Sequence, residues 1–134
     1  MTLAAASFSL LLIGCAGGFN VSGEWSGTMT QPGNLQTRNG FSLVLKLSQE
    51  GTVVTGISRI EIPETEYFGV MRLEGTLKND SLYFKEVELL DQKPRTRWCL
   101  KEGTLKFDRK TQRLAGPWNA EGCSPGEIDL LKVK

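Results

Sequence analysis

Apolar and polar residues alternate one by one in several parts of this sequence. Residues 41–47 read Phe-Ser-Leu-Val-Leu-Lys-Leu, and this period of two is what a strand with one buried face requires. The same alternation recurs over 71–77 and 114–120, where glycine takes some of the apolar positions. After Cys15 no helical period of 3.6 is present. The pattern therefore predicts an all-β protein.

Turn signals divide the chain into segments of strand length. We predict eight strands, at 22–30, 41–49, 52–61, 67–78, 81–90, 96–107, 113–121 and 127–133. Short strands with a turn about every ten residues are typical of antiparallel barrels and sandwiches. Parallel strands would need crossover helices, which the pattern does not provide. The fold class we expect is an eight-stranded antiparallel up-and-down β-barrel, with a small β-sandwich as the alternative.

Composition excludes several classes of function. The 134 residues include 16 basic and 15 acidic side chains, so the chain lacks the polybasic footprint of a nucleic-acid-binding protein. It has no histidine, the commonest general base and metal ligand. It has no phosphate-binding glycine-rich loop, nucleophile elbow or other catalytic motif. We therefore expect a protein that is not an enzyme and that uses no metal or cofactor.

The first fifteen residues form a distinct segment. They carry no charged side chain, and their apolar core at 8–13 is shorter than the roughly 20 residues of a membrane-spanning helix. The sequence Leu12-Ile13-Gly14-Cys15 resembles the lipobox of bacterial lipoproteins. The resemblance implies that residues 1–14 are a signal peptide and that Cys15 is the lipidated first residue of the mature chain. A plain secretory signal with a chance cysteine is the alternative.

The lipobox also implies a location. Residues 15–21 would be the lipidated cysteine and its tether, and 22–134 a single barrel domain. The lipid would hold the protein on a membrane of the bacterial cell envelope. Ala16 follows the cysteine, whereas an aspartate there retains lipoproteins at the inner membrane of enteric bacteria. By that analogy we expect the outer membrane.

The remaining cysteines form an even pair if Cys15 carries lipid. Cys99 and Cys123 would then lie in an oxidising compartment, which favours a disulfide. An up-and-down topology places both residues at the same end of the barrel. We expect a Cys99–Cys123 disulfide, with two buried free thiols as the alternative.

Alternate connections of an up-and-down barrel lie at opposite ends. The first, third, fifth and seventh connections each carry a proline, and they are 31–40, 62–66, 91–95 and 122–126. The other three are shorter, so we expect a loop-rich end and a tight-turn end. Binding usually involves loops on a rigid scaffold. Because Cys15 precedes the first strand, the lipid should lie beneath the tight turns and the loop-rich end should point away from the membrane.

The first predicted strand contains Gly23-Glu24-Trp25. This Gly-x-Trp resembles the opening of many calycin barrels, the superfamily of lipocalins and avidins. Residues 53–56 and 114–118 also resemble strands of avidin-type barrels. The resemblance implies that Trp25 plugs the narrow end and that the barrel binds a small or lipidic ligand. The aromatic residues that hold ligands in those families have no counterpart that can be aligned here.

Two segments are candidates for binding. Glu86 and Glu88 are in phase with Leu82 and Phe84. Either they point into the barrel, where they would bind a cationic or hydrogen-bonding ligand or stabilise a polar network, or a bulge near Lys85 turns them outward and Val87 and Leu89 inward. Of these two arrangements we expect the bulge.

The second candidate segment, 93–98, combines basic residues with an aromatic one. Arg95, Arg97 and Trp98 could meet an acidic partner or an anionic headgroup. The alternative, which we favour, is a solvated hairpin tip with Trp98 packed under the disulfide. Its charges could also pair with the acidic loop 61–66 at the same end.

Two functions remain open at this point. We expect a non-enzymatic lipoprotein whose calycin-like barrel binds a small or lipidic ligand. The alternative is an envelope protein-interaction or protease-inhibitor module whose barrel is filled by side chains. An eight-stranded barrel suits either, because it can be just filled or can hold one small ligand.

Overall fold

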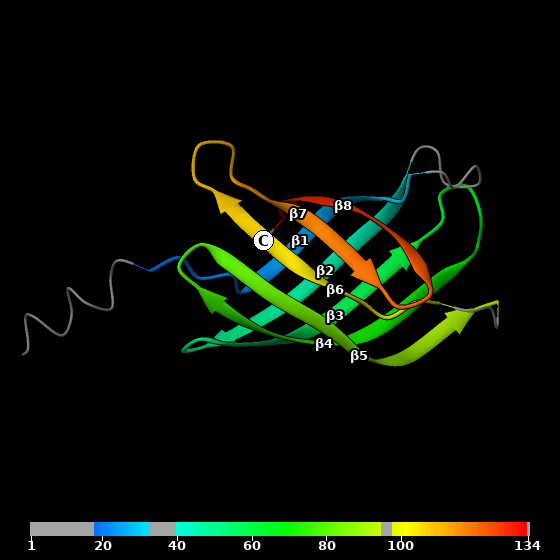
Figure 1. Cartoon of the computed structure of the whole chain (residues 1–134), viewed down its shortest axis with the longest axis horizontal. Coiled ribbons are helices and arrows are strands. Elements are labelled where there is room, and N and C mark those ends of the chain that lie inside the picture. The colour runs from blue at the N-terminus through cyan, green and yellow to red at the C-terminus, as the bar shows by residue number, and fades with distance from the viewer. Residues whose placement is uncertain (1–17, 33–39, 95–97, 134) are drawn as a thin grey trace, which may run out of the picture.

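The computed structural model is a closed antiparallel β-barrel, and it describes residues 18–32, 40–94 and 98–133 (Figure 1). The eight strands are β1 Gly23–Thr30, β2 Phe41–Glu50, β3 Val53–Glu61, β4 Phe68–Lys78, β5 Ser81–Lys93, β6 Lys101–Asp108, β7 Arg113–Ala120 and β8 Cys123–Lys132. Each strand pairs with the next along the chain, and β1 pairs with β8 to close the barrel. The predicted up-and-down barrel is confirmed, and the sandwich is excluded. No helix among the described residues is long and apolar enough to cross a membrane.

Two predicted strands begin at the wrong residue. β6 begins at Lys101 rather than at 96, and β8 begins at Cys123 rather than at 127. Ala120 pairs directly with Cys123, and Gly122 has a φ of 78°, so the seventh connection is a two-residue turn. Pro125 falls where the β7–β8 register is irregular, a place that tolerates a residue without an N–H. This corrects the expectation of an elaborate seventh loop, and the loop-rich end has three long connections.

An aromatic cluster plugs the tight-turn end of the barrel. Trp25 is fully buried, and its Nε1 donates to the Val21 carbonyl at 2.9 Å. The rings of Phe19 and Phe107 stack with centroids 4.0 Å apart, and both meet the Trp25 ring edge-on. The predicted position of Trp25 is therefore confirmed.

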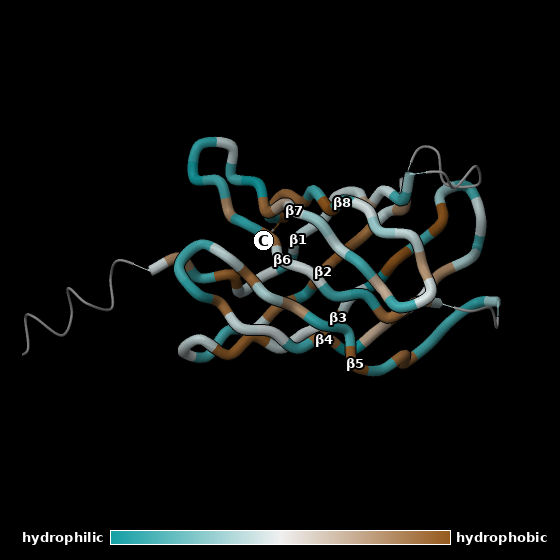
Figure 2. The backbone as a smooth tube through the Cα atoms, viewed as in Figure 1, coloured by the Kyte–Doolittle hydropathy of each residue, from teal (hydrophilic) through white to brown (hydrophobic). Residues whose placement is uncertain are grey.

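Buried leucines fill the interior between this plug and the middle of the barrel. They are Leu45, Leu73, Leu82, Leu105, Leu114 and Leu130, none more than 1% exposed. Figure 2 shows apolar and polar residues alternating along the strands, as the sequence pattern predicts. The core therefore comes from one face of every strand.

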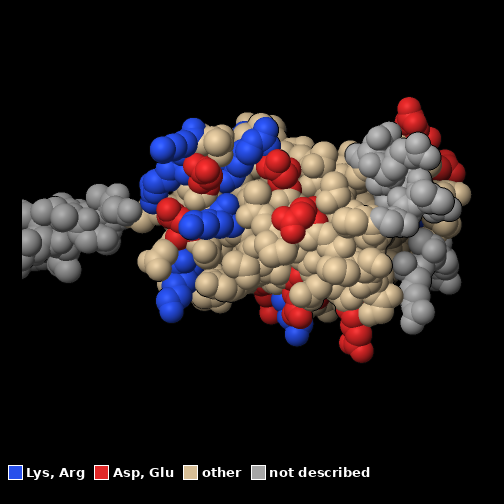
Figure 3. Space-filling model, turned by 45° about the horizontal axis from the view of Figure 1, so that its top comes forward, with Lys and Arg blue, Asp and Glu red and all other residues tan. Residues whose placement is uncertain are grey.

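The tight turns and the N-terminal segment share one end. Backbone hydrogen bonds join the turns, from Leu77 N–H to the Thr52 carbonyl and from Phe107 N–H to the Asp80 carbonyl, both 2.8 Å. Val21 N–H donates to Gln49 Oε1 near the β2–β3 turn at 2.8 Å. In Figure 3, Lys and Arg side chains gather at the end from which the N-terminal segment leaves. The described chain therefore enters the barrel on the side of the tight turns.

Candidate functional site

β5 and β6 pair along only part of their length. Their register runs from Ser81 opposite Lys106 to Lys85 opposite Glu102 and ends there. β5 nevertheless continues to Lys93, paired only with β4 among the described residues. The separation leaves a lateral groove of about 790 Å³ near the loop-rich end. Its walls are formed by 85–87 of β5, the segment 98–102, and the β7–β8 turn.

A buried ion pair lies at the inner end of this groove. Lys101 Nζ is 2.5 Å from Glu86 Oε2, and both side chains are no more than 2% exposed. Glu86 Oε1 accepts the Lys101 backbone N–H at 2.9 Å, and Lys101 Nζ donates to Ser58 Oγ at 3.4 Å. These hydrogen bonds offset the cost of removing two charges from water.

The carboxylate of Glu86 also explains why the two strands part. Continuing the register past Glu102 would bring the Lys101 N–H toward a β5 carbonyl. The Glu86 side chain accepts this N–H instead. A side-chain acceptor has thus replaced a backbone acceptor, and the β5–β6 ladder ends at this level.

The position of Glu86 corrects the expectation that a bulge near Lys85 turns it outward. Glu86 points inward, opposite Leu73, and the bulge follows at Val87, which has no partner on β4. The bulge brings Glu88 to the outer surface, where its carboxylate accepts from Arg72 at 3.0 Å. The hydrogen bonds to Glu88 and Glu74 raise the pKa of Arg72 above its ordinary value. The strand phase of Glu86 taken by itself did not predict this arrangement, because the buried cationic partner of Glu86 lies on another strand.

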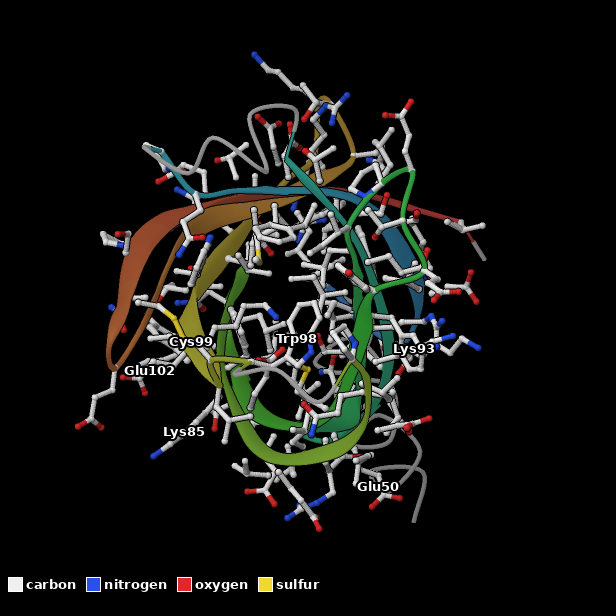
Figure 4. All side chains as sticks on the ribbon, turned by 90° about the vertical axis from the view of Figure 1, so that its right-hand side faces the viewer. Glu50, Lys85, Lys93, Trp98, Cys99 and Glu102 are labelled. Carbon is white, nitrogen blue, oxygen red and sulfur yellow. A yellow bond between two sulfur atoms is a disulfide. The ribbon has the colours of Figure 1, made fainter. Side chains whose placement is uncertain are left out.

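Trp98 lies over the centre of the barrel opening, seen from the loop-rich end in Figure 4. Its indole packs on Gly69 of β4, where an added Cβ would lie 3.0 Å from Trp98 Cδ2. The buried Trp98 Nε1 has no hydrogen-bond partner among the residues that the structure describes. Gln92, the register partner of Gly69 on β5, has a buried Oε1 that also lacks a partner there. The mouth thus holds one donor and one acceptor that lack partners among the described residues, and both belong to residues adjacent to Gly69.

The predicted disulfide is present and holds this region together. Cys99 and Cys123 are bonded, with Cα atoms 6.5 Å apart. The bond joins the segment entering β6 to the start of β8, across β7. It therefore fixes the chain directly after Trp98 to the opposite rim of the groove.

Three of the predicted site residues, Cys15, Arg95 and Arg97, lie outside the described residues. In the part of the basic segment that the structure describes, Lys93 forms an exposed ion pair with Glu66 of the acidic loop at 3.2 Å. Such a pair contributes little to stability.

Three residues of this region were not predicted from the sequence: Ser58, Gln92 and Lys101. A signal for Lys101 did exist, because it is in phase with Leu105 and Phe107 and therefore points inward. An inward lysine facing an inward glutamate on the neighbouring strand predicts a buried pair. No comparable signal marked Gln92, whose inward position depends on the bulges of β5.

The described residues contain no group of three or more acidic or cysteine side chains placed to hold a metal ion. Comparison of the chain with protein-family models, curated proteins and solved structures gives no match. The candidate site thus has two parts. One is the mouth, the barrel opening at the loop-rich end, where Trp98 Nε1 and Gln92 Oε1 lack partners among the described residues. The other is the lateral groove, which ends at the Glu86–Lys101 ion pair.

Proposed function

We propose that the protein is a non-enzymatic lipoprotein of the bacterial cell envelope that binds a small ligand at the mouth of its barrel. The observation that carries the proposal is a pair of buried polar atoms, Trp98 Nε1 and Gln92 Oε1, that have no hydrogen-bond partner in the described part of the chain. An unsatisfied buried donor or acceptor costs about 1–3 kcal/mol. A ligand that supplies both partners recovers this free energy on binding.

The arrangement favours a particular ligand chemistry. The ligand needs one acceptor for the indole N–H and one donor for the Gln92 oxygen, as an amide or a hydroxy-carbonyl group provides. An apolar or planar part would lie against Trp98. The adjoining groove, which Trp98 also lines, has a volume of about 790 Å³, within the range of small-molecule sites. Both unpaired atoms belong to residues at the mouth, so we place such a ligand at the rim of the barrel.

The lipobox resemblance supplies the setting. A lipid on Cys15 anchors the chain on the side of the tight turns, in the outer membrane by the analogy with enteric bacteria. The mouth then faces away from the membrane, where a ligand can reach it.

Native mass spectrometry of the protein purified from its own membrane tests the proposal. We expect an added mass on the wild type and its loss in Trp98→Phe, which keeps the ring and removes the N–H. Trp118→Phe is the matched control, because the Trp118 indole already donates to the Thr30 carbonyl at 3.0 Å. A wild type without added mass, or equal retention in Trp98→Phe, would contradict ligand binding at the mouth.

One observation favours a second function, that of a protein-interaction module. Between Val87 and Lys93, β5 has a strand neighbour on one side only among the described residues. Exposed Leu90 and Leu100 lie next to this edge, and an extended peptide can add to such an edge as a further strand. Slowed amide hydrogen exchange in 87–93 upon addition of a purified envelope partner would support this function. Unchanged exchange in the bound state would exclude this edge.

A further inference from the structure

The tight-turn end carries a cluster of basic side chains, called the basic end below. Its members lie next to two of the tight turns and at the end of β8: Lys78, Lys106, Arg109, Lys110, Arg113 and Lys132. Lys78 and Lys106 both lie opposite Ser81, on either side of it in the sheet. Figure 3 shows the basic side chains at this end, beside the start of the described chain.

Most of this positive charge is not neutralised within the barrel. Arg109 pairs with Asp80 at 3.0 Å, and Arg113 pairs with Asp129 at 2.8 Å. The four lysines of the basic end form no ion pair with any residue that the structure describes. Asp108, the nearest carboxylate in sequence to Lys110, accepts the backbone N–H of that lysine at 2.8 Å. The ammonium groups of Lys78, Lys106 and Lys110 are therefore available to an external anion, whereas that of Lys132 lies 6.0 Å from the centroid of the Trp25 ring.

Exposed apolar side chains lie at the same end. Val53 and Val133 are 58% and 53% exposed, and Tyr83 and Leu131 are also exposed. Val53 directly follows the β2–β3 turn, and Val133 directly follows β8. Lysines interspersed with aliphatic and tyrosine side chains are the composition of surfaces that rest at a membrane–water interface.

We propose that the basic end is a lipid-binding surface that docks on anionic phospholipid headgroups. The inference rests on the proposed membrane anchor and adds a contact made by the folded barrel itself. A single lipid modification is strengthened by a basic patch beside it, and this patch lies where the chain leaves toward Cys15. Nucleic acid would need only the positive charges, and it gives no role to the exposed valines. Docking would hold the barrel upright, with its mouth away from the bilayer.

The lipid-free chain of residues 16–134 provides the test. It contains every strand and the whole core from Val21 to Leu130, and circular dichroism checks its fold. We expect cosedimentation with phosphatidylcholine vesicles that contain phosphatidylglycerol, weakening as salt screens the charges. Pure phosphatidylcholine vesicles should bind it much less.

Two double variants with the same change in net charge locate the surface. Each lysine near an anionic membrane contributes about fivefold to binding, so Lys106→Gln/Lys110→Gln should weaken it about 25-fold. The control Arg59→Gln/Arg72→Gln alters exposed basic residues outside both the basic end and the groove, and it should bind like the wild type. Equal loss in both variants, equal binding to both kinds of vesicle, or tighter binding to short duplex DNA would overturn the proposal. Because this chain has no lipid, the outcome is independent of whether Cys15 is an anchor.

Discussion

Glu86 contacts Lys101 twice, accepting the backbone N–H with one carboxylate oxygen and the ammonium group with the other. One side chain thereby ends a strand ladder and neutralises a buried charge. The two roles belong together, because the gap between β5 and β6 leaves the lysine without a backbone neighbour on that side. The groove beside the mouth is thus a direct consequence of this one pairing.

Breaking the pair should be strongly destabilising. Lys101→Met leaves the Glu86 carboxylate buried without a counter-charge, and we expect a loss of about 3–5 kcal/mol in the free energy of unfolding. The double variant Glu86→Gln/Lys101→Met should recover most of that loss, because no uncompensated charge remains and the amide oxygen can still accept the backbone N–H of residue 101. Urea denaturation measures both. Glu61→Gln, which removes the exposed partner of Arg59, is the control and should change stability by less than about 1 kcal/mol. A double variant no more stable than Lys101→Met would count against the charge explanation.

The disulfide should contribute substantially to stability. Cys99 and Cys123 are 24 residues apart in the sequence, and removing a native disulfide from a small secreted domain typically costs about 2–5 kcal/mol. We expect Cys123→Ser to lower the midpoint of urea unfolding accordingly. Peptide mapping without reduction should recover the Cys99–Cys123 pair from envelope protein. Recovery of both cysteines as free thiols would refute it.

Trp25 should be among the most sensitive positions of the core. Trp25→Ala removes the centre of the aromatic plug, and we expect a loss of about 3–5 kcal/mol by calorimetry or denaturation. Tyr83→Ala, at an exposed aromatic, is the comparison and should stay within about 0.5 kcal/mol. Similar losses at the two positions would mean that the plug contributes little.

Cys15→Ala should release the protein from the membrane fraction. The wild type should incorporate an acyl label and sediment with membranes, whereas the variant should do neither. Fractionation and metabolic labelling together measure this. If the variant stays with the membranes and the wild type takes up no label, the lipobox interpretation is wrong.

Much of the fold could be predicted because alternation determines which face of a strand is buried. Residues 41–47 and 71–77 show the pattern most clearly, and both lie in strands as expected. β8 was harder to place, since Gly122, Pro125 and Gly126 together have the composition of a loop. Its early start depends on tertiary pairing with β7 and on a register irregularity that accommodates the proline.

The candidate site was predictable only in part, for a related reason. Glu86 and Trp98 stand out in the sequence by residue type, but their environments depend on partners in other strands. Ser58 and Lys101 come from β3 and β6, and only the closed barrel brings them to Glu86. The bulges of β5 determine which residues beyond Glu86 face inward. The local sequence gives no sign of these bulges.

Because the β5–β6 ladder ends early, different interactions hold the strands together at the two ends of the barrel. Around the aromatic plug each described strand pairs with both of its neighbours. Near the mouth the Glu86 side chain joins β5 to the start of β6 instead, and the disulfide ties the segment before β6 to β8. Opening that rim would break side-chain contacts rather than a backbone ladder between β5 and β6. A ligand of the proposed kind would therefore enter or leave by local rearrangement, which costs less free energy than global unfolding.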